Sequence, residues 1–389
     1  MKKHLFAASV TTALAVTSAS VAAESSVTLY GVIDTGLGYA KVSGDYRDPK
    51  TGAVNRLDNS HVGMTNGTTA GSRWGLRGKE DLGGGLYATF KLESGFNSAN
   101  GTPGQNNRLF GRDAVVGLTS ADLGKLEFGR QFNIGTQYML SIFGANFGNG
   151  FTQWNTGAGL GLSGAAFGRY DNMVLYETPS MGGLTAAISY SSNIDDKRDG
   201  ETGFATADNT RAVTAGLRYL NGPLAAFLSY DQLNGSNKLS QPSERNATPR
   251  SYLIGVSYDF EVVKLLLAYG RTTDGWFGGS SLPAGAAIGK FSGIPTNAFV
   301  DGFKSNSYLA GISAPVGAAG SMFASWQRAD ANNSRLTSDD ATTNTFSLGY
   351  TYSLSKRTAI YGLASYTNNY AFLRDAKYTD VSVGLRHAF

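Results

Sequence analysis

The chain of 389 residues has no cysteine, and it has only three histidines and nine prolines. Without cysteine there can be no disulfide bond and no thiolate metal site. His4 lies in the N-terminal segment, and His61 and His387 are far apart in the sequence, so the chain offers neither a Ser/His/Asp arrangement nor a histidine metal site. We therefore expect no catalytic residue, no metal and no cofactor.

The chain also lacks an apolar run of the roughly 20 residues that a transmembrane helix needs. Its apolar N-terminal run, from Leu5 to Val16, follows Lys2 and Lys3 and leads to the small residues Ala22 and Ala23. This order is typical of a secretory signal peptide, and the run is too short for a membrane anchor. The sequence predicts that residues 1–23 are cleaved and that 24–389 form a single exported domain.

Acidic and basic side chains are nearly balanced, with 33 Lys and Arg against 29 Asp and Glu. They are mixed along the chain rather than gathered in a basic block, so a nucleic-acid partner is not expected.

Glycine and aromatic residues are abundant, with 51 Gly, 20 Tyr and 21 Phe. They lie in segments of about ten residues in which apolar side chains alternate with polar or small ones, the pattern of strands. The predicted strands are 26–41, 72–81, 85–96, 109–119, 124–131, 172–179, 183–192, 210–220, 223–232, 250–260, 261–272, 305–315, 320–329, 342–353, 357–367 and 378–389.

Short turns alternate with long polar loops between these strands, and 42–71 is one of the predicted loops. A meander with this alternation is typical of an outer-membrane barrel, whose strands must close into a ring because lipid tolerates no unpaired backbone amides. A soluble β-sandwich would show the same alternation within each strand. The export signal, the scarcity of proline, the even strand number and the tyrosines near strand ends favour the barrel.

Several stretches together resemble the general porins of Gram-negative outer membranes, over essentially the whole predicted mature chain. They are SSVTLYGVIDTGLGY, SRWGLRGKEDLGGGLYATFKLESGF, GRDAVVGLTSADLGKLEFGRQ, GRYDNMVLYETP and the final VGLRHAF. The resemblance implies an all-β protein, a sixteen-stranded antiparallel transmembrane β-barrel that assembles as a homotrimer in lipid and lipopolysaccharide. It also implies a long third loop, about 132–171, folded into the lumen as a constriction, and passive diffusion of small hydrophilic solutes.

By motif, Arg73, Arg112 and Arg130 match the constriction arginines of that family, and Arg77 and Lys79 follow Arg73 on the same strand face. The family's constriction loop usually carries acidic residues, whereas this chain has no Asp or Glu between Glu127 and Asp171. Fixed cations facing few anions in a narrow pore favour anions. We therefore expect anion preference, unless the arginines are paired with the possible lumen acids Asp34, Glu80 and Glu93.

The facing of two arginines conflicts with strict alternation. Alternation places Arg112 on the face of Val116 and Leu118, and Arg130 on the face of Phe128. Either a bulge shifts the parity, or the apolar side chains face inward beneath the folded loop while Gly117 and Gly129 face a neighbouring subunit. We favour the second interpretation, and proximity of Arg112 to Arg130 would support it.

The predicted loop contains aromatic residues and one arginine, namely Phe143, Phe147, Phe151, Trp154 and Arg169. Such rings either line a path for sugars or organic anions, which would make the channel substrate-selective, or anchor the loop to the wall. Anchoring is the more common role.

The chain ends on Phe389, after a strand whose apolar residues alternate. In the porin family, a terminal Phe is the signal read by the machinery that inserts barrels, and a free strand edge is what such a receptor can pair with. The long polar loops leave a surface adhesin as an alternative main role. An energy-coupled transporter would need a plug before the first strand, and the first strand begins close to the predicted cleavage site.

Overall fold

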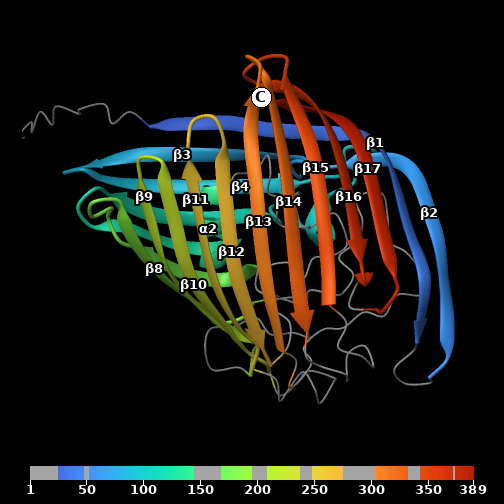
Figure 1. Cartoon of the computed structure of the whole chain (residues 1–389). Helices are drawn as coiled ribbons and strands as arrows, with labels where there is room; N and C mark the ends of the chain where they lie inside the picture. The colour runs from blue at the N-terminus through green and yellow to red at the C-terminus, as the bar shows by residue number, and fades with distance from the viewer. Residues whose placement is uncertain are drawn as a thin grey trace, which may run out of the picture.

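The protein is a closed β-barrel, shown in Figure 1. This computed structural model describes residues 25–47, 52–143, 168–194, 208–236, 248–274, 302, 304–331, 342–370 and 373–389. The predicted signal peptide, 1–23, lies outside the described residues. Short turns and the C-terminus lie at one end of the barrel, at the top of Figure 1, and the strand ends that the longer connections join lie at the other end.

Seventeen strands are present in the described part of the chain, all antiparallel to their neighbours. In order they are β1 Ser26–Arg47, β2 Val54–Asn66, β3 Arg73–Gly83, β4 Leu86–Gly95, β5 Asp113–Ser120, β6 Gly124–Phe132, β7 Arg169–Glu177, β8 Leu184–Ser191, β9 Arg211–Asn221, β10 Leu224–Asn234, β11 Arg250–Asp259, β12 Lys264–Thr273, β13 Lys304–Val316, β14 Gly320–Ala331, β15 Thr342–Ser353, β16 Thr358–Asn368 and β17 Lys377–Ala388. The helical segments are α1 Gly104–Asn107, a single turn, and α2 Ile134–Phe143.

The ring has sixteen strand positions because β2 and β3 share one of them. Both pair with the same strand, β1: residues 26–32 of β1 pair with β3, and residues 35–47 pair with β2. The other edge of β1 pairs with β17 over residues 32–43, which closes the barrel. The predicted sixteen-stranded barrel is confirmed, but the prediction that 42–71 is entirely a loop is wrong, because 54–66 is strand.

The break between β2 and β3, residues 67–72, is held by Asp34, whose side chain has no solvent exposure. One carboxylate oxygen of Asp34 accepts hydrogen bonds from the backbone N of Thr69 (2.9 Å), the hydroxyl of Thr69 (2.5 Å) and the backbone N of Ala70 (2.8 Å). The other accepts one from the Tyr361 hydroxyl at 2.6 Å. Asp34 thus ties the interrupted strand to β16, across the closing seam of the barrel.

We expect Asp34→Ala to lower the temperature at which the barrel unfolds. The substitution leaves four donors without their acceptor, and each buried unsatisfied donor costs about 1–3 kcal/mol. The measurement is the temperature at which the folded form converts to the unfolded form on detergent gel electrophoresis. Asp58→Ala is the matched control, because Asp58 lies on β2 with an exposed side chain paired to Lys41; equal temperatures for the two variants would contradict the expectation.

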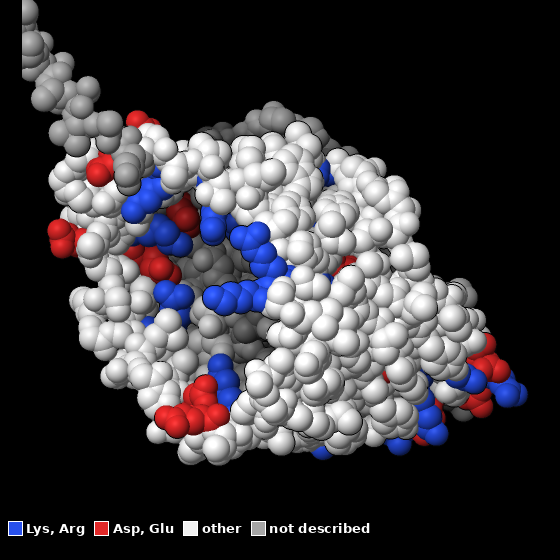
Figure 2. Space-filling model, turned by 90° about the horizontal axis from the view of Figure 1, so that it is seen from above, with Lys and Arg blue, Asp and Glu red and all other residues white. Residues whose placement is uncertain are grey.

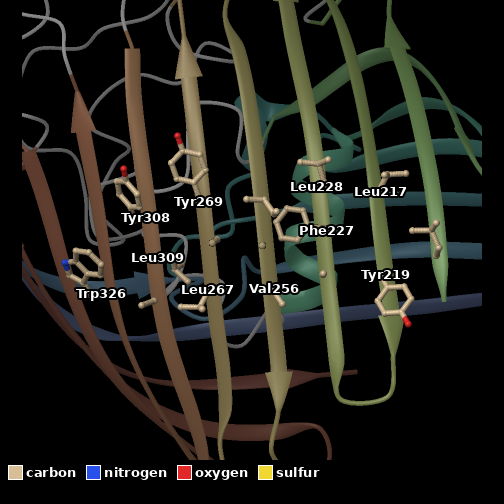
Figure 3. A pocket seen from close by; sticks show the side chains of 16 residues that line it. Leu217, Tyr219, Phe227, Leu228, Val256, Leu267, Tyr269, Tyr308, Leu309 and Trp326 are labelled. Carbon is tan, nitrogen blue, oxygen red and sulfur yellow. The ribbon is translucent and has the colours of Figure 1, made fainter. Parts of the chain in front are cut away.

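The two faces of the sheet differ in the way that a barrel in lipid requires. Apolar residues such as Leu29, Val116 and Val383 are exposed, while Ser, Thr and Asp on the alternate positions are buried. Figure 3 shows part of the exposed face between β9 and β14, where Leu228, Val256 and Leu267 line an apolar hollow of about 590 Å³ and α2 lies behind the strands. Neither helix in the described part of the chain is long and apolar enough to cross a membrane.

Candidate functional site

Viewed from the short-turn end, the barrel is hollowed, and Lys and Arg side chains line much of the opening (Figure 2). Deeper along the inner wall, β3 to β7 and the connection between β4 and β5 bring together a set of charged residues, which we call the basic cluster. It contains six cations and three carboxylates: Arg73, Lys91, Arg108, Arg112, Arg130 and Arg169 with Glu93, Asp113 and Asp171.

Glu93, on β4, is the first centre of the basic cluster, and its side chain is 5% exposed. Arg112 donates from Nε to Glu93 Oε1 at 2.6 Å, and Arg73 Nε lies 3.5 Å from Oε2. Lys91 Nζ is 3.9 Å from the same oxygen, which also accepts the Tyr30 hydroxyl at 2.8 Å. One carboxylate therefore holds three cations and a tyrosine in place.

Asp171, on β7, is the second centre. Arg108 Nη1 lies 2.7 Å from both of its carboxylate oxygens, and Arg130 Nη1 lies 2.6 Å from one of them. Arg130 also donates from Nε to the backbone O of Gly111, at 2.8 Å. Because Gly111 precedes Arg112, this bond brings Arg130 beside the first centre.

Asp113, at the start of β5, is the third centre. It pairs with Lys91, and Arg169 Nε lies 3.7 Å from it. The Arg169 guanidinium stacks 3.4 Å from the centroid of the Phe132 ring, a cation–π contact that holds it against the wall.

The six cations outnumber the three carboxylates, so the basic cluster carries three positive charges in excess. Side chains at this site are only 5–22% exposed, apart from Lys91 at 45%. Partial burial lowers the local dielectric constant, so the excess charge acts on passing ions more strongly than it would in bulk water.

Arg130 bonds to the backbone of Gly111, the residue before Arg112, but the favoured interpretation of how the two arginines face is wrong. Val116 and Phe128 are 59% and 44% exposed on the outer face, so they do not lie beneath a loop. A register shift between Gly129 and Gln131 lets the wall depart from strict alternation. Gly129 has φ of +126°, and Asn172, which precedes its partner Met173 on β7, has φ of +52°. Gly117 is buried on the inner side rather than turned toward a neighbour.

The other predicted charged residues have separate places. Arg77 and Lys79 are exposed on the inner face of β3, over the rings of Tyr30 and Tyr87. Of the possible lumen acids, Glu93 belongs to the basic cluster. Asp34 is buried in the structural network described above, and Glu80 shares the outer face with Trp74, because strand positions alternate.

The beginning of the predicted constriction loop is α2, which packs on the inner faces of β8 to β11. Asn133 precedes the helix, accepting from Thr136 N at 3.2 Å and donating to Asp231 at 2.7 Å. At the other end, Lys264 Nζ donates to the backbone O of Ile142 at 3.0 Å, where the helix dipole favours a cation.

Phe143 closes α2 as an anchor rather than as part of a solute path. It is 2% exposed, and its ring meets Phe227 edge to face with centroids 5.8 Å apart. The other three predicted loop aromatics, Phe147, Phe151 and Trp154, lie outside the described residues.

We expect Phe143→Ala to increase the fluctuations of the open-channel current. Truncating a buried Phe costs about 3–5 kcal/mol, and here that loss falls on the contact that holds the end of α2 to the wall. Current noise in a planar bilayer is the measurement, and Phe260→Ala, which truncates an exposed Phe at a short turn, is the control. Noise as low as in the unmodified protein would show that the ring does not hold the helix.

Lys91, Arg108, Asp113 and Asp171 complete the basic cluster, although they are not among the residues predicted from the sequence. Asp113 follows the predicted Arg112 directly, and Lys91 is two positions before Glu93 on one strand face, so period-two spacing was an available signal. Arg108 and Asp171 are 63 residues apart and meet only through the fold. The described residues contain no group of three or more His, Asp or Glu that could hold a metal ion.

The comparisons with known proteins agree with this architecture. A model of the Gram-negative porin family matches residues 10–371. An outer membrane porin protein of Bordetella pertussis is 54% identical, and outer membrane porin protein 32 of Delftia acidovorans is 31% identical, each over the full length of both chains.

Among solved structures, the anion-selective porin from Comamonas acidovorans is 28% identical, with a TM-score of 0.68 over 94% of this chain and 100% of that chain. OmpF of Salmonella typhi is 15% identical, with a TM-score of 0.60 over 93% of this chain and 97% of that chain, and shows the fold alone. This chain belongs to the Gram-negative porin family: it is an outer-membrane barrel that provides a water-filled passage for the passive diffusion of small hydrophilic solutes, and not an enzyme.

Proposed function

We propose that this porin prefers anions and that the basic cluster is the part of the channel that selects them. The observation that carries the proposal is the excess of six cations over three carboxylates on one stretch of the inner wall. A fixed positive charge of this kind concentrates anions in the lumen and repels cations. The 28% identical porin from Comamonas acidovorans is described as anion-selective, which is consistent with this proposal.

The pairing of the arginines refines the argument without reversing it. Arg73 and Arg112 are paired with Glu93, one of the acids that could have neutralised them. Glu93, however, is shared among three cations, and a shared carboxylate can neutralise only one of them. Because Asp171 and Asp113 are each shared between two cations, the same holds there.

The decisive measurement is the reversal potential of the purified protein in a planar bilayer across a potassium chloride gradient. We expect the sign that corresponds to faster chloride passage. A potential of the opposite sign would refute the proposal, and the absence of conductance steps would favour the adhesin role instead.

Substrate selection along a path of aromatic rings receives no support from the described part of the loop. Phe132 lies under Arg169, Tyr138 donates to Glu177 at 3.1 Å, and Phe143 packs on Phe227. These three rings anchor the chain to the wall, so a general channel for small hydrophilic solutes is the function proposed here.

We propose that the protein assembles as a homotrimer through the outer faces of its first strands. Leu37 on β1 and Val62 and Met64 on β2 form an exposed apolar patch, at 63%, 81% and 52% exposure. Exposed apolar patches of neighbouring strands are typical contact surfaces. The mass of the detergent-solubilised particle tests the assembly, and a monomeric mass would overturn it.

Phe389 is proposed as the assembly signal read by the barrel-insertion machinery. Its backbone exchanges two hydrogen bonds with Gly31, at 3.0 and 3.1 Å, and its ring is 44% exposed. Before the seam between β1 and β17 closes, this last strand offers a free edge that a receptor can extend. Deleting Phe389 should lower the amount of barrel in the outer membrane, and unchanged levels would contradict the role.

A further inference from the structure

A second basic site lies on the inner wall at the short-turn end of the barrel, apart from the basic cluster. It is a cavity of about 110 Å³ between the turn joining β15 to β16, the end of β17 and the 67–72 segment. Its lining is mostly polar and includes the three cations Lys356, Arg357 and Arg386. No Asp or Glu lines this cavity. We call it the vestibule pocket.

The turn that carries two of these cations is well defined. Ser355 Oγ accepts hydrogen bonds from the backbone N of Arg357 and of Thr358, both at 3.1 Å. The backbone O of Arg357 accepts from Ala388 N at 2.8 Å, which fixes the turn to the end of β17. The two exposed side chains thus extend from a rigid backbone rather than from a long loop.

The opposite side of the vestibule pocket is supplied by Thr69 and Tyr361, which belong to the Asp34 network. The hydroxyls of Thr69 and Tyr361 both donate to the carboxylate of Asp34, so the oxygens of Asp34 point toward these two donors. Arg386 lies opposite Asp34 in the β1–β17 register and is half-buried. The negative charge is therefore engaged by four donors within the wall, while two of the three lining cations are exposed.

We propose that the vestibule pocket binds small oxyanions such as inorganic phosphate on the short-turn side of the basic cluster. Several oxygens on one small anion suit a pocket that offers cations from three positions and the hydroxyls of Thr351 and Ser353 beside them. The pocket faces the lumen, because Tyr361 and Arg386 alternate with the exposed outer residues Ile360 and Leu385. Oxyanions thus meet one positive site at the short-turn end and a second at the basic cluster.

The test is the chloride current through single channels, with inorganic phosphate added to both sides at constant conductivity. We expect phosphate to reduce the current of the unmodified protein in a saturable way. Lys356→Gln combined with Arg357→Gln should weaken this block by about tenfold, from the loss of two charged donors. Lys304→Gln combined with Lys377→Gln, which removes the same charge from exposed positions at the loop end of the barrel, should leave the block unchanged.

Two outcomes would overturn the proposal that the vestibule pocket binds oxyanions. One is no saturable block by phosphate in the unmodified protein, and the other is a block of the same strength in the Lys356/Arg357 variant as in the unmodified protein. Folding is checked by the temperature of conversion on detergent gels, and the substituted side chains are exposed in a turn. The reversal potential in phosphate-free potassium chloride separates the two proposals. A variant that loses phosphate block but keeps its anion preference supports the pocket, whereas a cation-preferring unmodified protein refutes the basic cluster's role independently of phosphate block.

Discussion

Replacing Arg73, Arg112 and Arg130 together with glutamine is expected to reduce strongly the preference of the channel for anions. The basic cluster would then retain Lys91, Arg108 and Arg169 against three carboxylates. Equal numbers of fixed positive and negative charges leave the basic cluster with no net charge to sort ions by sign. The reversal potential across a potassium chloride gradient should fall toward zero.

The triple variant should still fold, because each carboxylate keeps a partner. Glu93 retains Lys91 at 3.9 Å, Asp171 retains Arg108 at 2.7 Å, and Asp113 retains both of its cations. This matters because a buried charge stripped of every partner would destabilise the wall and confuse the measurement.

The matched control removes three cations from the outer surface instead: Arg271→Gln, Lys304→Gln and Lys377→Gln. All three are exposed at the loop-side ends of β12, β13 and β17, on the alternate face from buried Thr272, Ser305 and Tyr378. Their loss changes the net charge of the protein equally but leaves the lumen unaltered. A reversal potential that shifts as much in the control as in the triple variant would attribute selectivity to overall charge and not to the basic cluster.

The strands were largely predictable because a barrel in lipid imposes one physical constraint on every strand. An outer face in hydrocarbon and an inner face in water force a period of two, and 378–389 or 342–353 can be recognised from that period alone. The strand Val54–Asn66 was not predicted because it lacks the alternation of apolar and polar residues: Arg56, Asp58 and His61 interrupt its apolar residues. It pairs with residues 35–47 of β1, beyond the part of β1 that contacts β3.

The site was predictable in part, and the remainder depended on contacts that no local pattern encodes. Motif resemblance identified three of the six cations, and Glu93 was among the expected partners. The Arg108–Asp171 pair joins the connection before β5 to the start of β7, so only the closed fold brings it together. The direction of the Arg130 side chain depended on the positive φ angles of Gly129 on β6 and Asn172 on β7. They accompany an irregularity in the pairing of these two strands, which alternation along one strand cannot reveal.

Replacing Glu93 with glutamine is expected to change the channel in the opposite direction to the triple variant, raising its preference for anions. The excess of fixed positive charge would grow from three to four, while the shape of the side chain is kept. Arg73 and Arg112 would lose their shared counter-charge, and removing one partner of a buried ion pair costs about 3–5 kcal/mol. A lower unfolding temperature should therefore accompany the larger reversal potential.

Glu80→Gln is the control, because Glu80 is an exposed acid of the adjacent strand on the outer face of the wall. It removes the same charge without touching the lumen, and its reversal potential and unfolding temperature should match those of the unmodified protein. The pair of outcomes distinguishes two roles for Glu93. If it only organises the arginines, its loss would scatter them and lower the anion preference; if it also offsets their charge in the pore, the preference must rise. A fall in anion preference in Glu93→Gln would mean that the geometry of the basic cluster, and not its net charge, selects the ions.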